Sequence, residues 1–222
     1  MSRSIVTRLG PSIAALALLN ATPPAHAQGG SIPESSVMGL CGTVPAPAPS
    51  GPWDYRTATR EQRTLVESFH FTHSVETLSA GATGAIGGDL DYTLNKFPNH
   101  LRALSAMMRL SEKTRSMKPA GAKYPVECYF DRALRFAPND AQVRALYGFY
   151  LIQGKREKEA RIQLTAAEQL GPPDAQLAYN LGLAYFDLRE YDKSLAFAKQ
   201  AYAAGISVPG LRKKLTDAGK WH

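Results

Sequence analysis

The sequence predicts an all-α protein made of stacked pairs of helices, and three observations support this prediction. The stretch that begins at Ala141 matches the stretch that begins 34 residues later, at Ala175. Matching positions carry the same small residue: Ala141 and Ala175, Gly148 and Gly182, and Ala167 and Ala201. Prolines lie just before the start of each unit, at Pro138 and at Pro172-Pro173. A fixed period of this length indicates repeated units that bury their apolar faces against one another.

The two units resemble the tetratricopeptide repeat, a helix-turn-helix unit with small residues where its helices cross. In the unit 141–174 these small residues are Gly148, Ala160 and Ala167, and Pro172-Pro173 takes the closing place. The unit 175–208 matches best, although Ser194 stands where alanine is usual. Small residues let two helix backbones approach to the ~8–10 Å of close packing. The resemblance implies a tetratricopeptide helical-hairpin solenoid.

The same register divides the whole chain. We expect a signal peptide at 1–27, a strap at 28–58, a degenerate helical unit at 59–100, repeats at 101–140, 141–174 and 175–208, and a capping helix with a tail at 209–222. The degenerate unit is expected to hold one helix from about 59 to 80 and another from about 89 to 97. The first repeat carries six extra residues near 116–124, where Pro119 and Gly121 favour a loop.

The N-terminus has the pattern of a secretory signal peptide. Arg3 and Arg8 precede the apolar run 13–19, and Ala25-His26-Ala27 supplies small residues at a cleavage site. The apolar run is far shorter than the ~20 residues that span a bilayer. We therefore expect cleavage after Ala27 and a periplasmic product, and retention as an uncleaved anchor is the alternative.

The strap contains one of the two cysteines of the chain. Residues 28–52 are rich in Gly, Ser and Pro, a composition that cannot bury enough surface to fold alone. In an oxidising compartment Cys41 and Cys128 can form an intramolecular disulfide, which would fix the strap to the first repeat. The alternative is two unpaired thiols, with Cys128 packed in a helix.

Charge is unevenly distributed along the chain. Residues 28–100 contain 4 Lys and Arg against 7 Asp and Glu, whereas residues 101–222 contain 20 against 12. A basic surface attracts acidic protein segments, anionic polymers or lipid headgroups. We expect an envelope or exported protein as partner and no nucleic acid, with contact to a membrane surface not required. Lysines and arginines that merely solvate the outer helix faces are the simpler explanation.

The resemblance also implies that the first helix of each repeat lines a concave groove. The helical register projects these side chains into it: Arg102, Arg109, Gln142, Phe149, Gln176, Tyr179, Asn180, Leu183 and Phe186. Such a groove begins basic and becomes apolar and aromatic, which suits an amphipathic helix or an extended peptide with an acidic end. The carboxylate clamp of one subclass is not carried over, because Ser105 stands where the clamp needs lysine. Alternatively, the strap or the extra loop covers part of the groove.

Catalysis is not expected, because no nucleophile is paired with a base in any recognisable motif. We therefore expect a protein-binding scaffold, for example in secretion, pilus or polysaccharide-export assembly, without a cofactor or a resident metal. The alternative is a metal-dependent or polysaccharide-modifying enzyme that uses His70 and His73. With Glu67 and Glu76 these histidines are spaced three apart, which on one continuous helix would place two imidazoles and two carboxylates near one face. Thr72 could equally start a new helix and break that face.

Overall fold

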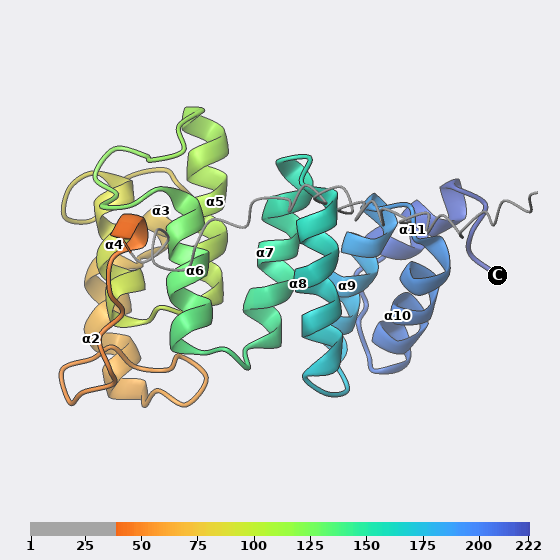
Figure 1. Ribbon diagram of the computed structural model, residues 1–222, viewed down its shortest axis with the longest axis horizontal. Helices are drawn as coiled ribbons and strands as arrows, with labels where there is room; N and C mark the ends of the chain where they lie inside the picture. The colour runs from red at the N-terminus through yellow and green to blue at the C-terminus, as the bar shows by residue number, and fades with distance from the viewer. Residues whose placement is uncertain (1–38) are drawn as a thin grey trace, which may run out of the picture. The chain divides into compact units, whose positions relative to one another are not determined.

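The computed structural model of the protein describes residues 39–222, and each regular element in that range is helical (Figure 1). After a short turn at 39–41, the helices are α2 (Arg60–His70), α3 (His73–Glu76), α4 (Ile86–Lys96), α5 (Leu101–Thr114), α6 (Val126–Phe136), α7 (Ala141–Gln153), α8 (Glu157–Gln169), α9 (Ala175–Asp187), α10 (Tyr191–Ala203) and α11 (Gly210–Asp217). The all-α prediction is confirmed. The predicted signal peptide lies outside the described residues.

The period of the sequence reappears in the helices. Helices α7 and α9 begin 34 residues apart, at Ala141 and Ala175, and α8 and α10 begin 34 residues apart, at Glu157 and Tyr191. Helix α7 packs against α8, α9 packs against α10, and α7 also contacts α9 (Figure 1). Each pair is therefore a helical hairpin that leans on the next one.

Glycine allows close contact at two equivalent positions. A Cβ atom on Gly148 would lie 2.7 Å from a side-chain carbon of Leu164 in α8. On Gly182 it would lie 2.5 Å from a side-chain carbon of Leu211 in α11. Ser194 fits where alanine was expected, because its buried hydroxyl donates to the Gly182 carbonyl oxygen at 2.8 Å. At both repeated glycines, a leucine side chain of another helix thus packs directly on the glycine backbone.

The core consists of three consecutive apolar clusters. The first joins α3 to α7 and contains Leu90, Leu104 and Phe130. The second lies between α7, α8 and α9, and the third holds α9 and α10 against α11. In the third cluster Leu211 and Leu215 of α11 are fully buried, so this short helix covers the end of the last hairpin.

The predicted helix over residues 59–80 is wrong as a single element. Helix α2 ends at His70, and Thr72 precedes the separate one-turn helix α3. Phe71, between them, leaves the helical conformation with φ −129° and ψ 46°. Its side chain is buried with its ring 4.6 Å from the His100 imidazole, so tertiary packing breaks the helix. The next helix begins at Ile86, three residues earlier than expected.

The strap is fixed to α6 by a disulfide, as the cysteine count suggested. Cys41 and Cys128 are bonded, with their Cα atoms 4.9 Å apart. Arg132 of α6 donates to the carbonyl oxygens of Cys41 and Thr43, at 3.2 and 2.7 Å, and Arg135 donates to that of Gly42 at 3.0 Å. Covalent and polar contacts therefore hold the same short stretch of strap.

Further along, the strap joins α2 and the start of α5 through a partly buried polar cluster. The Tyr55 hydroxyl donates to Glu67 Oε1 at 2.7 Å, and His100 Nε2 lies 3.1 Å from the same oxygen. His100 is fully buried, and its Nδ1 accepts the Ala103 backbone N–H at the start of α5. Because Nδ1 is an acceptor, Nε2 carries the proton and donates to the Glu67 carboxylate.

Between residues 39 and 222 no helix is both long enough and apolar enough to span a membrane.

Candidate ligand-binding groove

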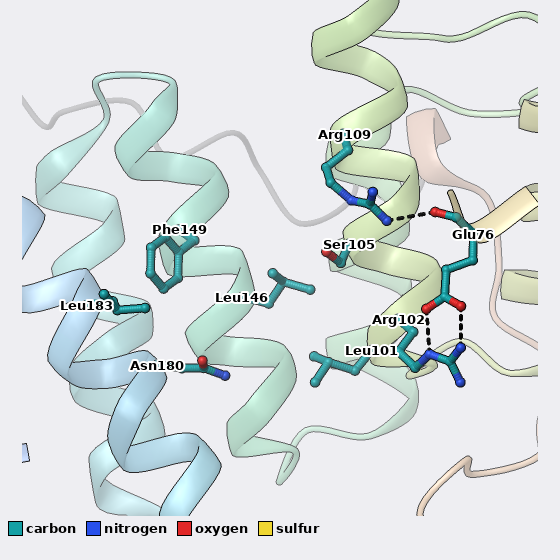
Figure 2. A pocket seen from close by; sticks show the side chains of 9 residues that line it. All are labelled: Glu76, Leu101, Arg102, Ser105, Arg109, Leu146, Phe149, Asn180 and Leu183. Atoms are coloured by element: carbon teal, nitrogen blue, oxygen red, sulfur yellow. Dashed lines mark hydrogen bonds and ion pairs between the residues drawn. The ribbon is translucent and has the colours of Figure 1, made fainter. Parts of the chain in front are cut away.

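A groove of about 310 Å³ lies between α5, α7 and α9 (Figure 2). Its lining comes from α3, these three helices and no other element: Glu76, Leu101, Arg102, Ser105, Arg109, Leu146, Phe149, Asn180 and Leu183. Helices α7 and α9 occupy equivalent places in successive hairpins and contact each other. Helix α5 contacts α7 on its other side. Repetition of the hairpin thus places side chains from distant parts of the sequence around one hollow.

The α5 side of the groove carries two arginines with different surroundings. Arg102 makes two hydrogen bonds with the Glu76 carboxylate, one of them from Nε at 2.7 Å. These bonds, together with the positive charge, hold the pKa of Glu76 below its ordinary value. Arg109 donates at 2.8 Å to the backbone carbonyl oxygen of Glu76 (Figure 2). Among the described residues Arg109 has no carboxylate partner, so its charge remains available to a ligand.

The opposite side of the groove is mainly apolar. Leu146 and Phe149 of α7 and Leu183 of α9 provide it, all half-buried (Figure 2). Asn180 adds one amide group among them. Its Oδ1 accepts a hydrogen bond from Gln176 at 3.1 Å, which leaves the Nδ2 donors for other partners. The groove can therefore take an apolar side chain and hydrogen-bond the polar group beside it.

The structure brings together five of the nine residues predicted to line the groove: Arg102, Arg109, Phe149, Asn180 and Leu183. Ser105 joins them. Gln142 lies outside this lining and donates to Asp174 at 3.2 Å. Gln176 also lies outside and acts through its bond to Asn180.

Tyr179 and Phe186 are corrections to the predicted groove. Tyr179 is only 8% exposed and packs edge-on against Tyr202, and Phe186 packs against Tyr191. Both belong to the cluster beneath α11. Residues seven apart lie on the same stripe of a helix, and this stripe of α9 faces forward to α11. Asn180 and Leu183 line the groove together with side chains of α7, and Leu183 also packs against the cluster beneath α11.

Glu76, Leu101 and Leu146 line the groove although the groove prediction did not include them, and Glu76 is the charged residue among them. The sequence singled out this residue as a candidate metal ligand, because its spacing from His73 matched a continuous helix. The observed chain turns after α2, and this turn carries Glu76 to Arg102 of α5. Its charge could have identified it. Glu76 is acidic, and Arg102 and Arg109 of α5 are the basic residues that it contacts.

The four candidate metal ligands do not converge. His70 ends α2, and its Nδ1 lies 3.1 Å from Oδ1 of the buried Asp89. Glu67 bonds to His100 and Glu76 bonds to Arg102. In residues 39–222 no group of three or more His, Cys, Asp or Glu side chains is placed to hold a cation. The predicted single face is broken at Phe71, so the His70 and His73 site does not form.

The Gly-rich stretch 81–88 is held in place by hydrogen bonds to the Asp89 side chain. Asp89 accepts the backbone N–H groups of Ala82 and Thr83, at 2.7 and 3.2 Å, and the Thr83 hydroxyl at 2.6 Å. The same carboxylate orients His70. This aspartate is thus fully hydrogen-bonded within the fold, as a buried carboxylate requires.

Physically, the groove offers one available cation, one amide and an apolar wall within a single hollow.

Comparison of the chain with protein-family models, with curated proteins and with solved structures found no match.

Proposed function

We propose that the chain is an exported repeat protein of the tetratricopeptide type, which binds a peptide segment of another envelope protein in the groove between α5, α7 and α9. The ligand segment presents an apolar side chain to Phe149 and Leu183 and a carboxylate to Arg109. Such a scaffold serves the assembly of an envelope system for secretion, pilus formation or polysaccharide export.

The repeat assignment is supported by the geometry of the two hairpins. The 34-residue spacing applies to both helices of the pair, and glycine occupies the same place in each first helix. Stacked hairpins leave a continuous surface formed by equivalent helices, which is the usual binding surface of repeat proteins.

The peptide assignment rests on one observation above all. Arg109 keeps its charge while Arg102 is neutralised by Glu76, and an apolar wall faces it across the same groove. A cation opposite aromatic and aliphatic side chains is suited to a segment with an acidic and an apolar residue close together. Affinity would come mainly from the apolar anchor and orientation from the charge.

Export is supported by the N-terminal pattern and by the disulfide. Arg3, the apolar run and Ala25-His26-Ala27 read as a signal peptide. A structural disulfide between Cys41 and Cys128 persists in oxidising compartments such as the periplasm and is rare in the cytosol.

Site-specific photocrosslinking in intact cells tests the proposal. A photoreactive phenylalanine analogue at Phe149 is expected to trap a defined envelope protein. The matched control carries the same analogue at Ile162, which is 65% exposed on α8 and outside the groove. Arg109→Glu together with Leu183→Ala, added to the Phe149 probe, is expected to abolish the crosslink while the helical circular dichroism is unchanged. Equal crosslinks from both positions, or a crosslink that survives these changes, would refute the groove assignment.

A further inference from the structure

A second surface of the protein gathers exposed apolar side chains at α2 and α4. Leu65 and Phe69 of α2 are 62% and 61% exposed, and Tyr92 of α4 is 42% exposed. Leu65 and Phe69 are four residues apart, so they lie on one face of α2. Val66, next to Leu65, is buried and also lines the hollow described below. An exposed apolar cluster on a folded protein marks an interaction surface.

These side chains surround a hollow of about 400 Å³. Pro49 and Trp53 of the strap form one edge of it, Leu65 and Phe69 of α2 a second, and Tyr92 and Lys96 of α4 a third. The wall is held in place, because the Tyr92 ring stacks on His70 at 3.9 Å and His70 is fixed by Asp89. The surface therefore contains both protruding apolar side chains and a preformed hollow beside them.

Within residues 39–222, the other end of the helical series is covered by a short helix. There α11 lies against α9 and α10, and its own apolar side chains, Leu211 and Leu215, are buried. Arrays of repeats need a covered or polar face at each end. Before α2, the described part of the chain supplies only the strap, which forms an edge of the hollow and leaves Leu65 and Phe69 exposed.

We propose that a second copy of this chain covers the surface, in a two-fold symmetric dimer formed through α2 and α4. A two-fold contact requires a patch that is complementary to itself. This patch meets the requirement, because Phe69 or Leu65 of one copy enters the hollow of the other and the reverse contact forms at the same time.

Charge favours the same occupant. Glu61, one turn before Leu65 on α2, and Lys96 at the hollow have no salt-bridge partner within residues 39–222. The Lys96 ammonium donates only to the Ser50 carbonyl oxygen, at 2.9 Å. A second copy supplies an ammonium group for Glu61 and a carboxylate for Lys96, so one two-fold contact can pair both charges twice. A copy of the chain thus satisfies both the apolar and the charged groups of the patch.

Sedimentation velocity across a wide range of protein concentrations tests the dimer. The unaltered protein is expected to sediment with twice the mass of a single chain. Phe69→Glu and Leu65→Glu place carboxylates in the contact and are expected to give the monomer with an unchanged circular-dichroism spectrum. Ile162→Glu is the matched control, since it charges an equally exposed apolar residue on α8, and it is expected to remain dimeric. A monomeric unaltered protein, or variants that remain dimeric, would overturn the proposal.

A cysteine crosslink tests the same contact without disturbing it. Ser68 is exposed on α2 beside Phe69, and both native cysteines are already paired. In a two-fold dimer Ser68→Cys is expected to form a disulfide with itself on mild oxidation, whereas Thr165→Cys, exposed on α8, is expected to stay monomeric on non-reducing gels. A crosslink at Thr165→Cys and none at Ser68→Cys would place the interface elsewhere and reject this one. Both tests are independent of ligand binding in the groove.

Discussion

At the scale of single residues, His100 concentrates several structural roles. It is fully buried, it accepts the Ala103 N–H that begins α5, and it donates to Glu67. Burial holds the pKa of His100 below its ordinary value, although Glu67 opposes this shift. The hydrogen bond from His100 in turn holds the pKa of Glu67 below its ordinary value, against burial. Neutral imidazole and ionised carboxylate are thus the forms that the fold stabilises.

Acid is therefore expected to destabilise the protein through this pair. The unfolded chain binds a proton at His100 near the ordinary histidine pKa of 6.5, while the folded chain does so only at lower pH. The free energy of unfolding should then fall as pH decreases from about 6.5, and again below about 4.5 as Glu67 is protonated. Urea unfolding at a series of pH values measures this dependence.

His100→Asn is the matched variant for that measurement. Asparagine can cap α5 through its side-chain oxygen but does not titrate. The variant is expected to lose the decline just below pH 6.5 and to show a weaker one below 4.5, because Glu67 also loses the hydrogen bond from His100. An unchanged decline in His100→Asn would assign it to another group.

At the scale of elements, residues 42–58 of the strap show how a segment without helix or strand becomes part of the fold. Its disulfide closes a loop with a sequence separation of 87 residues, and α6 holds its backbone through Arg132 and Arg135. A cross-link over a loop of this length stabilises mainly by restricting the unfolded chain. The strap is thereby held against α6 although it buries few apolar side chains.

Removing the disulfide is expected to lower the free energy of unfolding by about 2–5 kcal/mol. The change is Cys41→Ser together with Cys128→Ala, and urea unfolding measures it. Limited proteolysis should also cut the variant between Gly42 and Pro49, where the unaltered protein resists. A reducing agent should destabilise the unaltered protein and leave the variant unchanged. Equal stability of the two proteins would show that the polar contacts of α6 suffice.

The sequence predicted the helices best where apolar periodicity and tertiary packing agree. The start of α7 at Ala141 and of α9 at Ala175 follow from the repeat and from the Asp residues that cap them, Asp140 and Asp174. The break after α2 was only an alternative, drawn from Thr72 as a helix start. The sequence could not decide for it, because Phe71 packs against His100, which lies far along the chain. Groove residues on α5 were predicted, whereas the cover that α11 places over Tyr179 depends on a helix outside the repeat.

At the scale of the whole described chain, contacts are mostly between neighbouring helices. Helix α11 contacts α9 and α10, and α9 contacts α7, whereas α2 and α3 contact α4 and α5. Stability in such a series is close to a sum of local terms and nearest-neighbour terms. Damage at one end should therefore remain near that end.

Leu211→Ala tests this locality. Leu211 is fully buried at Gly182, and removal of such a leucine costs about 2–5 kcal/mol. Hydrogen exchange measured by mass spectrometry is expected to show faster exchange in α9, α10 and α11 and unchanged exchange in α2 to α6. Leu104→Ala, in the first cluster, is the matched control and should give the opposite pattern. Uniformly faster exchange in either variant would indicate one cooperative unit.

The arginines of α6 have one more consequence, which concerns how the strap can change over time. Arg132 and Arg135 grip peptide oxygens, and every amino acid supplies a peptide oxygen. The side chains of Thr43 to Pro49 are therefore free to vary through mutation, provided that Cys41 and the two guanidinium groups are kept. Gly42 is not, because its φ is +66° and a Cβ atom there would lie 2.6 Å from the Tyr124 hydroxyl oxygen. Variation among descendants of this gene should accumulate in that stretch long before it touches the residues that hold it.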